Sequence, residues 1–411
     1  MTKLTSSADE RMNLMRVMPL MPLMPLMAAS FLQVVDMMLV NPLGAWIVPE
    51  LGLGTTQFSL LLLAYNLVSA GVGLLSAPLL DGANRRLVLF ASCLALSLVT
   101  LLTALASDLA EIALLRGFAG VFGGLIASQT LAMIGDLVAP AQRGRAIGFV
   151  MSAFGLASVA GVPLSLALAG LWGWRAAFVG VGSAGIVVAV FMLTLPRVHS
   201  LAKAPAPRWR ERLAAGRAHG AALLAAFFLT ASAFLVVPFI GIFYTTHLGV
   251  QATELGLVYL AGGGGAALFM ACLGGWVDRF GAPRCFFSVT SLSMVSILIL
   301  TRLAQLVPAD RGLWAAVPAS LLFFCLMAGR MVPLNALLIE RVPPAQRGSF
   351  MSLNVAAQSL AAAVGAVAGG FLSSLGGAVA GTFPTNGTVS VALSFIAMAV
   401  VLTLRRPSRF H

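Results

Sequence analysis

Long apolar runs dominate this sequence, and their length restricts what the chain can fold into. They recur from residue 18 to residue 404, and a helix of about 20 apolar residues crosses the hydrocarbon core of a bilayer. Only 9% of the 411 residues are charged, against roughly 25% in soluble domains. A large soluble helical protein would need polar helix faces, which these runs lack. The sequence therefore predicts an all-α protein that spans a membrane.

Twelve of the runs are long enough to be transmembrane helices. The first is too long for the apolar region of a secretory signal, and no small-residue cleavage site follows it. We therefore interpret it as a membrane helix. The predicted spans are 18–47, 56–80, 86–106, 110–135, 146–170, 175–196, 219–246, 254–277, 284–306, 312–338, 349–374 and 384–404.

Basic residues are distributed unevenly between these spans. With the N-terminus in the cytoplasm, 20 of the 25 Lys and Arg residues fall on the cytoplasmic side. Cytoplasmic loops of membrane proteins carry such an excess. We therefore predict a multi-pass protein of a bacterial-type inner membrane, surrounded by lipid, with both termini in the cytoplasm. The net charge of +12 also suggests nucleic-acid binding, but basic residues in short loops favour membrane topology, and we expect no nucleic-acid partner.

The chain repeats itself in two halves. Residues 139–144 (APAQRG) and 343–348 (PPAQRG) match at an offset of 204, and Asp136 and Glu340 share that offset. Such repeats are typical of transporter folds. We predict an N-terminal six-helix bundle over 1–196, a basic cytoplasmic linker over 197–218 and a C-terminal six-helix bundle over 219–411. The linker is either a solvated tether or a segment that contacts anionic lipid.

Two loops carry a motif that resembles the major facilitator superfamily. The segment GGWVDRFGAPR (274–284), with Asp278 and Arg279, is similar to the loop signature Gly-x-x-x-Asp-Arg-x-Gly of that superfamily. A degraded first copy, APLLDGANRR (77–86), keeps Asp81, Arg85 and Arg86. The resemblance extends over nearly the whole chain.

Motifs within the predicted helices give a closer resemblance, to the drug:proton antiporter group of that superfamily and especially to its arabinose-efflux-permease-like branch. The segments GRMVP and RGSFMSLN also fit that branch. The matching residues are Asp36, Asn41 and Pro42 in the first span, Arg116 and Gly120 in the fourth, and Gly155, Gly161 and Pro163 in the antiporter motif of the fifth.

The resemblance implies two pseudo-symmetric six-helix bundles that work as a monomer. It further implies proton-coupled export of a small organic solute or drug by alternating access, driven by the proton gradient without a cofactor. Two alternatives stay open: a proton-coupled importer of a small organic solute, including anionic ones, and a non-transporting membrane receptor or scaffold. The sequence contains no nucleophile–base pair and no cluster of metal-ligand residues, so we predict neither an enzyme nor a metal site.

Two charged residues lie deep in spans of the N-terminal half. An ionised carboxylate such as Asp36 at the bilayer centre costs roughly 2.5–3.5 kcal/mol on insertion scales, so it normally faces a cavity, has a partner or is protonated. Arg116 cannot lose its proton and also needs a partner. We predict that Asp36 and Arg116 couple transport to protons, while a purely structural role for either remains an alternative. Gly120, Gly123 and Ala127 follow at helical spacing and indicate close helix packing.

Other polar residues within the spans are candidates for the solute site. Each is equally well suited to an interhelical hydrogen bond. The predicted solute-binding residues are Gln33, Asn41, Tyr65, Asn66 and Gln129 in the first half and Arg330, Asn335, Asn354 and Gln358 in the second.

Acidic and basic residues also gather at the cytoplasmic ends of the spans. By resemblance they form ion-pair latches that hold the outward-facing state. The alternative is that the arginines only set the membrane topology. Basic residues do that without acidic partners, so this alternative does not explain the acids. The predicted gating residues are Asp81, Arg85, Arg86, Asp136, Arg143, Asp278, Arg279, Glu340 and Arg347.

Overall fold

The computed structural model describes residues 23–79, 84–138, 142–196, 219–308, 311–342, 347–375 and 379–404. Twelve helical segments in this part of the chain are long and apolar enough to cross a membrane. The predicted fold class, an all-α protein of twelve membrane helices, is therefore confirmed. The predicted linker over 197–218 and the start of the predicted span 18–47 lie outside the described residues.

The helix boundaries lie within a few residues of the predicted spans wherever both are described. The first half contains α2 (Met24–Glu50), α3 (Thr55–Leu79), α4 (Arg85–Thr103), α5 (Leu109–Leu137), α6 (Arg143–Leu156), η3 (Ala157–Gly161), α7 (Val162–Trp172) and α8 (Trp174–Met192). The second half contains α10 (Gly220–Phe234), η4 (Val237–Phe239), α11 (Ile240–His247), η5 (Ala252–Glu254), α12 (Leu255–Phe280), α13 (Ala282–Thr301), α14 (Leu303–Leu306), α15 (Gly312–Gly329), α16 (Met331–Arg341), α17 (Arg347–Ser374) and α18 (Val379–Leu404).

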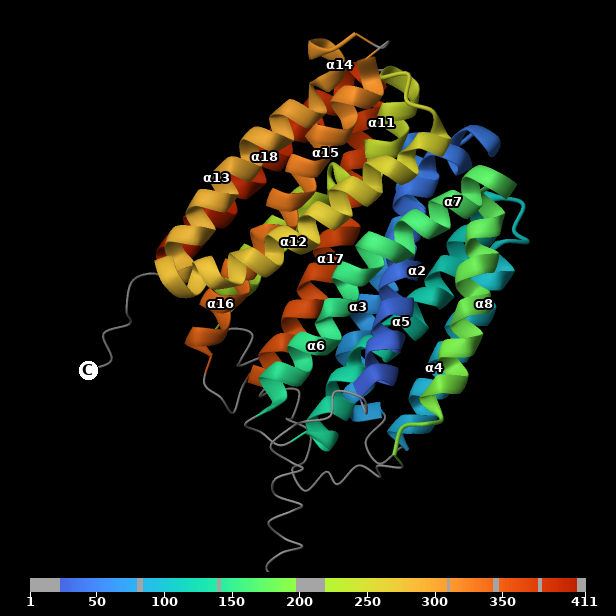
Figure 1. Ribbon diagram of the computed structural model, residues 1–411, viewed down its shortest axis with the longest axis vertical. Helices are drawn as coiled ribbons and strands as arrows, with labels where there is room; N and C mark the ends of the chain where they lie inside the picture. Colours follow the sequence, from blue (N-terminus) through green and yellow to red (C-terminus); the bar gives the residue numbers. More distant parts are fainter. Residues whose placement is uncertain are drawn as a thin grey trace, which may run out of the picture.

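The helices form one bundle, with α13, α15 and α18 on one side and α4, α5 and α8 on the other (Figure 1). In the first half α3 packs on α5 and α4 packs on α8, while in the second half α10 packs on α17 and α18. Contacts of α3 with α17, of α12 with η3 and α7, and of α2 with α11 join the halves. The Thr55 hydroxyl at the start of α3 donates to the Gly370 carbonyl oxygen of α17 at 3.1 Å, so the halves meet at this end of the bundle.

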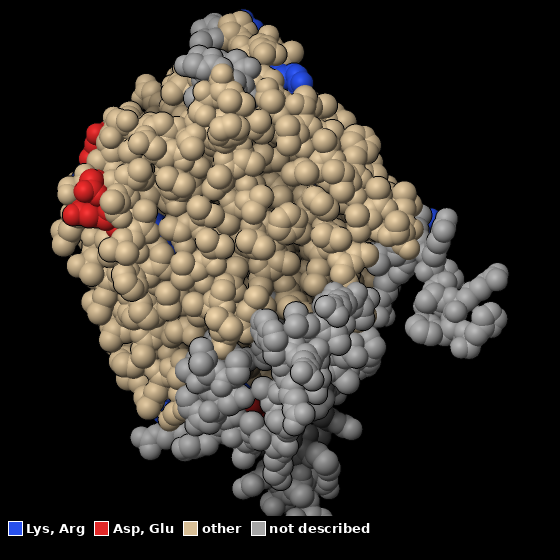
Figure 2. Space-filling view, turned by 180° about the vertical axis from the view of Figure 1, so that it is seen from behind, with Lys and Arg blue, Asp and Glu red and all other residues tan. Residues whose placement is uncertain are grey.

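The outer surface is apolar over most of its height. Figure 2 shows one broad face on which Lys, Arg, Asp and Glu are sparse and lie mostly near the edges. Large apolar side chains stay exposed within the spans; Leu268 of α12 and Val187 of α8 are 73% and 70% exposed. Contiguous apolar surface of this kind is rare on soluble monomers but suits contact with lipid tails.

Several of the described membrane helices depart from regular α geometry; the tenth span, for example, is interrupted at Arg330 between α15 and α16. The π-helical segment η3 lies between Gly155 and Pro163, two residues of the antiporter-like motif in the fifth span. The seventh span breaks between α10 and α11, around Pro238. Asn386 of α18 donates from Nδ2 to the Leu235 carbonyl oxygen at 3.1 Å. That bond gives a partner to backbone freed by the break, as non-helical backbone in a membrane requires.

Glycines let α5 approach α3 closely. A Cβ added at Gly120 would overlap the carbonyl oxygen of Tyr65, and one at Gly123 would overlap the Tyr65 hydroxyl. At the next turn Gly124 is the close residue, where a Cβ would lie 2.8 Å from the Ser69 carbonyl oxygen. The small-residue face predicted on this helix therefore holds Tyr65 directly against α5.

Candidate functional site

A buried ion pair joins α2 to α5. Asp36 Oδ1 lies 3.0 Å from Arg116 Nη2, and Arg116 Nη1 donates to the backbone carbonyl oxygen of Asp36 at 3.1 Å. The two side chains are 0% and 1% exposed. Each charge therefore has the partner that a membrane interior requires.

Three further helices surround this pair. Thr100 of α4 donates to Asp36 Oδ1 at 2.7 Å. The rings of Tyr65 on α3 and Phe178 on α8 flank the guanidinium, with centroids 5.6 Å and 5.5 Å from its Cζ atom. Aromatic faces at this distance attract a cation. The pair thus sits where α2, α3, α4, α5 and α8 converge.

Each member of the ion pair keeps one polar atom without a recorded partner. Asp36 Oδ2 and Arg116 Nε are both buried, and neither has a hydrogen bond among the described residues. Buried polar atoms are normally hydrogen-bonded. Both the arginine and the Thr100 hydroxyl engage the same carboxylate oxygen, Oδ1, which leaves the other free.

The structure brings two of the five polar candidates of the first half to this cluster. Gln33 Nε2 donates to the Tyr65 hydroxyl at 3.3 Å, one helical turn from Asp36. Asn66 instead donates to its own helix at the Leu62 carbonyl oxygen, and Gln129 accepts from Arg85 Nη1 at 3.5 Å. Asn41 is buried, and its Oδ1 has no recorded partner. No recorded contact among the described residues links Asn41, Asn66 or Gln129 to the Asp36–Arg116 pair.

The second half holds its own buried arginine, Arg330, which is 1% exposed at the end of α15. Arg330 Nη2 donates to the Leu229 carbonyl oxygen and the Ser232 hydroxyl of α10, both at 2.7 Å. Its Nη1 donates to Ser394 of α18 at 3.1 Å and to Ser293 of α13 at 3.4 Å. Within the described ranges, no carboxylate lies within ion-pair distance of this guanidinium.

The other polar candidates of the second half do not meet Arg330 through any recorded contact in the described part of the chain. Asn354 is buried on α17 and its Oδ1 has no recorded partner. Asn335 and Gln358 are half-buried, on α16 and α17. The structure therefore does not assemble these residues into one polar site.

The two arginines occupy comparable positions in the two halves. Each lies on the fourth span of its half and contacts the first and sixth spans: Arg116 through Asp36 and Phe178, Arg330 through Ser232 and Ser394. Hydroxyl groups stand in the second half where the first half has a carboxylate. Of the two clusters, as far as the structure describes them, only the first therefore contains a carboxyl that can exchange a proton.

The predicted gating residues that the structure describes form no ion pair or hydrogen bond between the two halves. Arg85 Nε of α4 lies 2.7 Å from Asp136 Oδ2 of α5, and Arg86 Nη1 donates to the Leu195 carbonyl oxygen at 3.2 Å. Both interactions lie within the first half. Asp278 and Arg279 are exposed in the last turns of α12. Asp81 and the side chains of Arg143, Glu340 and Arg347 lie outside the described residues.

A polar cluster at the opposite end of the first half was not predicted. Glu50, the last residue of α2, forms an ion pair with Arg175 and accepts from Trp174 Nε1 at 2.8 Å. The Arg175 guanidinium lies 4.3 Å from the Trp174 ring centroid. The cluster ties the end of α2 to the start of α8. The sequence did carry a signal for this cluster, because Glu50 follows one apolar run and Arg175 begins another.

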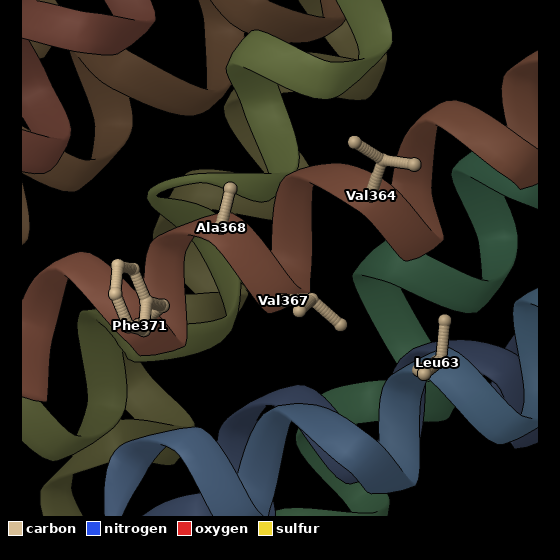
Figure 3. A pocket seen from close by; sticks show the side chains of 5 residues that line it. All are labelled: Leu63, Val364, Val367, Ala368 and Phe371. Atoms are coloured by element: carbon tan, nitrogen blue, oxygen red, sulfur yellow. The ribbon is translucent and has the colours of Figure 1, made fainter.

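An apolar crevice lies between α3 and α17, where the two halves meet. Its volume is about 380 Å³, and Figure 3 shows the five side chains that line it: Leu63, Val364, Val367, Ala368 and Phe371. None of them carries a hydrogen-bonding group, so this crevice cannot select a polar solute through hydrogen bonds. Its shape must change whenever α3 and α17 move against each other.

Comparison with known proteins places this sequence in a family. The family model described as Major Facilitator Superfamily matches the chain twice, over residues 26–221 and 222–410. The chain is 28% identical to the multidrug transporter protein MdtP of Bacillus subtilis over 164 residues, which cover 40% of this chain and 30% of MdtP. It is 29% identical to the transcription regulatory protein OpdE of Pseudomonas aeruginosa over 329 residues, 78% of each chain. The matched region of MdtP is thus less than a third of its length.

A solved structure shares the fold. It is a bacterial homolog to the human lysosomal transporter Spinster, in an inward-facing and occupied conformation. The TM-score is 0.72 at 18% sequence identity, and the match covers 93% of this chain and 95% of that one.

Proposed function

Because this chain belongs to the major facilitator superfamily, as its motifs indicated, we propose that it is a proton-coupled secondary transporter. It exports a small organic solute, such as a drug, by alternating access between two six-helix bundles. The observation that supports this proposal is the buried Asp36–Arg116 pair. Among the described residues, Asp36 is the one carboxylate away from the ends of the membrane helices.

The pair offers a physical route to coupling. A proton carrier must alternate between charged and neutral forms inside the protein. Arg116 stabilises the charged form of Asp36 at a separation of 3.0 Å, and a change in that separation shifts the balance between the two forms. Movement of α2 against α5 during alternating access therefore loads or releases the proton. The proton gradient supplies the driving force.

Two features support a drug exporter. The relative MdtP is described as a multidrug transporter protein, which favours a drug-like solute. The fifth span also carries the residues that resemble the antiporter motif, and these flank the π-helical segment η3. Such π segments are frequent at functional sites. In an antiporter the solute and the proton move in opposite directions.

The experiment is a flux measurement on the purified protein in liposomes with a panel of organic compounds. We expect at least one compound to move against its gradient only when a pH gradient is imposed, with protons moving the opposite way. Protein-free liposomes are the control. Protons that move in the same direction as the solute would replace export with uptake, and a panel without any proton-coupled movement would contradict the proposal.

The orientation has a separate test. We propose that both termini and the linker lie in the cytoplasm, so Ser200→Cys should be unreactive to an impermeant maleimide in sealed right-side-out vesicles. Leu105→Cys, between α4 and α5 and 78% exposed, should react at once and serves as the matched position on the other side. The native cysteines are first replaced. Labelling of position 200 without permeabilisation would reverse the proposed orientation.

The charged cytoplasmic ends complete the proposed cycle. Arg85 and Asp136 hold α4 to α5 within the first half. Asp278 is exposed at the end of α12 and so is free to meet basic residues of the first half when the halves close on that side. Because exposed ion pairs typically contribute about 1 kcal/mol or less, such latches bias the two conformations without locking either.

A further inference from the structure

Thr100 is a neighbour of Asp36 whose hydroxyl can form a hydrogen bond with both the charged and the neutral form of the Asp36 carboxyl. Its Oγ1 lies 2.7 Å from Asp36 Oδ1 and 2.8 Å from the Leu96 carbonyl oxygen of its own helix. The residue is 1% exposed. A hydroxyl has a single proton to donate but two lone pairs that accept. Thr100 can therefore donate to Asp36 or to Leu96, and not to both at once.

These two hydrogen bonds correspond to the two forms of Asp36. When the carboxylate is charged, the Thr100 proton points to Oδ1, beside the donation from Arg116 Nη2. When a proton binds to Oδ1, the new O–H group donates to Thr100 Oγ1, and the Thr100 proton turns to the Leu96 carbonyl oxygen. Asp36 gains one proton, and no covalent O–H bond of the protein breaks.

The remaining surroundings favour Oδ1 over Oδ2 as the atom that binds the proton. Asp36 Oδ2 has no recorded partner among the described residues, so a proton there would be a buried donor without an acceptor, which is unfavourable. The charged or titratable groups nearby are Arg116 on α5 and the Tyr65 hydroxyl on α3, and the latter is hydrogen-bonded to Gln33. Among the described residues of α6, η3, α7, η4, α8 and α11, which also pack on α2, no charged or titratable group is recorded in contact with Asp36.

We propose that Thr100 is a positioning residue for proton coupling: its hydroxyl donates to the charged carboxyl of Asp36, accepts from the neutral one, and so allows the proton to bind at Oδ1. This inference rests on the proposed role of Asp36. Arg116 also donates to the Asp36 backbone carbonyl oxygen, and that bond does not involve the carboxyl.

The test compares three purified variants in liposomes. Thr100→Val keeps the side-chain shape and removes the hydroxyl, whereas Thr100→Ser retains it. Thr103→Val is the matched control, because Thr103 is buried one turn along the same helix and its recorded bond goes only to the Val99 carbonyl oxygen. A hydrogen bond to a charged group is worth more than one to a neutral group, so losing the hydroxyl destabilises the carboxylate more than the acid.

In Thr100→Val, the pH at half-maximal gradient-driven flux should therefore move upward by about one unit, a tenfold change in proton affinity. Thr100→Ser and Thr103→Val should keep the wild-type profile. As a second measurement, the infrared band of protonated Asp36, identified by its loss in Asp36→Asn, should shift in Thr100→Val and not in Thr103→Val. This readout does not require the variant to transport.

The possible failures are distinguishable. A wild-type pH profile and an unshifted band in Thr100→Val, with Asp36→Asn inactive, would refute the role of Thr100 and leave that of Asp36. Equal shifts in Thr103→Val or in Thr100→Ser would also refute it, because neither variant removes the hydroxyl beside Asp36. Gradient-driven flux in Asp36→Asn would instead overturn the proposed function itself.

Discussion

Replacing Asp36 with asparagine should abolish transport driven by a pH gradient in a protein that still folds. Asparagine matches the shape of the neutral acid but cannot ionise, so one of the two states that coupling requires is lost. Leaving a buried charge without its partner costs up to about 3–5 kcal/mol. Arg116 nevertheless retains its bond to the backbone carbonyl at position 36. Arg330 is held by hydroxyls and a carbonyl oxygen, with no carboxylate partner among the described residues, so this fold accommodates such a buried guanidinium.

Proton-driven flux and solute binding are measured in the same purified Asp36→Asn protein, together with its melting temperature. Asp108→Asn is the control, because the same change there affects the N-cap of α5 at the protein surface, where asparagine caps as well as aspartate. We expect solute binding without gradient-driven flux in the first variant and wild-type flux in the second. Wild-type flux in Asp36→Asn would remove this residue as the carrier and leave a carboxylate at a helix end, or uniport, in its place.

The fold could be predicted because a bilayer imposes its thickness on the sequence. Each crossing needs a long apolar run, so all twelve spans were visible as runs. Interruptions within a span were harder to predict. Pro238 alone does not show that α10 ends at Phe234, because proline is tolerated in membrane helices when neighbours satisfy the freed backbone. Here the neighbour is Asn386, which bonds to the Leu235 carbonyl oxygen and is 151 positions from Leu235 in the sequence.

The core of the candidate site was also predictable, but its surroundings were not. Asp36 and Arg116 stand out because charges are rare in apolar runs, and each needs a partner. Thr100 carries no comparable signal, since a threonine in a membrane helix usually bonds to its own backbone, as Thr103 does. The hydroxyls around Arg330 come from three helices, so only the packed structure brings them together.

Adding a single methyl group at Gly120 should destabilise the protein, whereas the same change at Gly117 should not. A Cβ at Gly120 would overlap the backbone carbonyl oxygen of Tyr65, which cannot move without shifting α3. Overpacking of this kind typically costs about 1–3 kcal/mol. At Gly117, one turn earlier on the same helix, no atom lies within 4 Å of the added carbon. Alanine there gains up to about 1 kcal/mol of helix propensity.

Thermal unfolding in detergent compares Gly120→Ala, Gly117→Ala and Gly123→Ala. The third variant is intermediate, because its Cβ meets the Tyr65 hydroxyl at the end of a side chain that can turn. We expect a lower melting temperature for Gly120→Ala, an unchanged or higher one for Gly117→Ala, and a small loss for Gly123→Ala. Gradient-driven flux should fall in the Gly120 and Gly123 variants, since both displace Tyr65 from its position over the Arg116 guanidinium. Equal melting temperatures for the Gly117 and Gly120 variants would mean that α3 and α5 are not packed this closely. The position of Tyr65 beside the ion pair would then need another explanation.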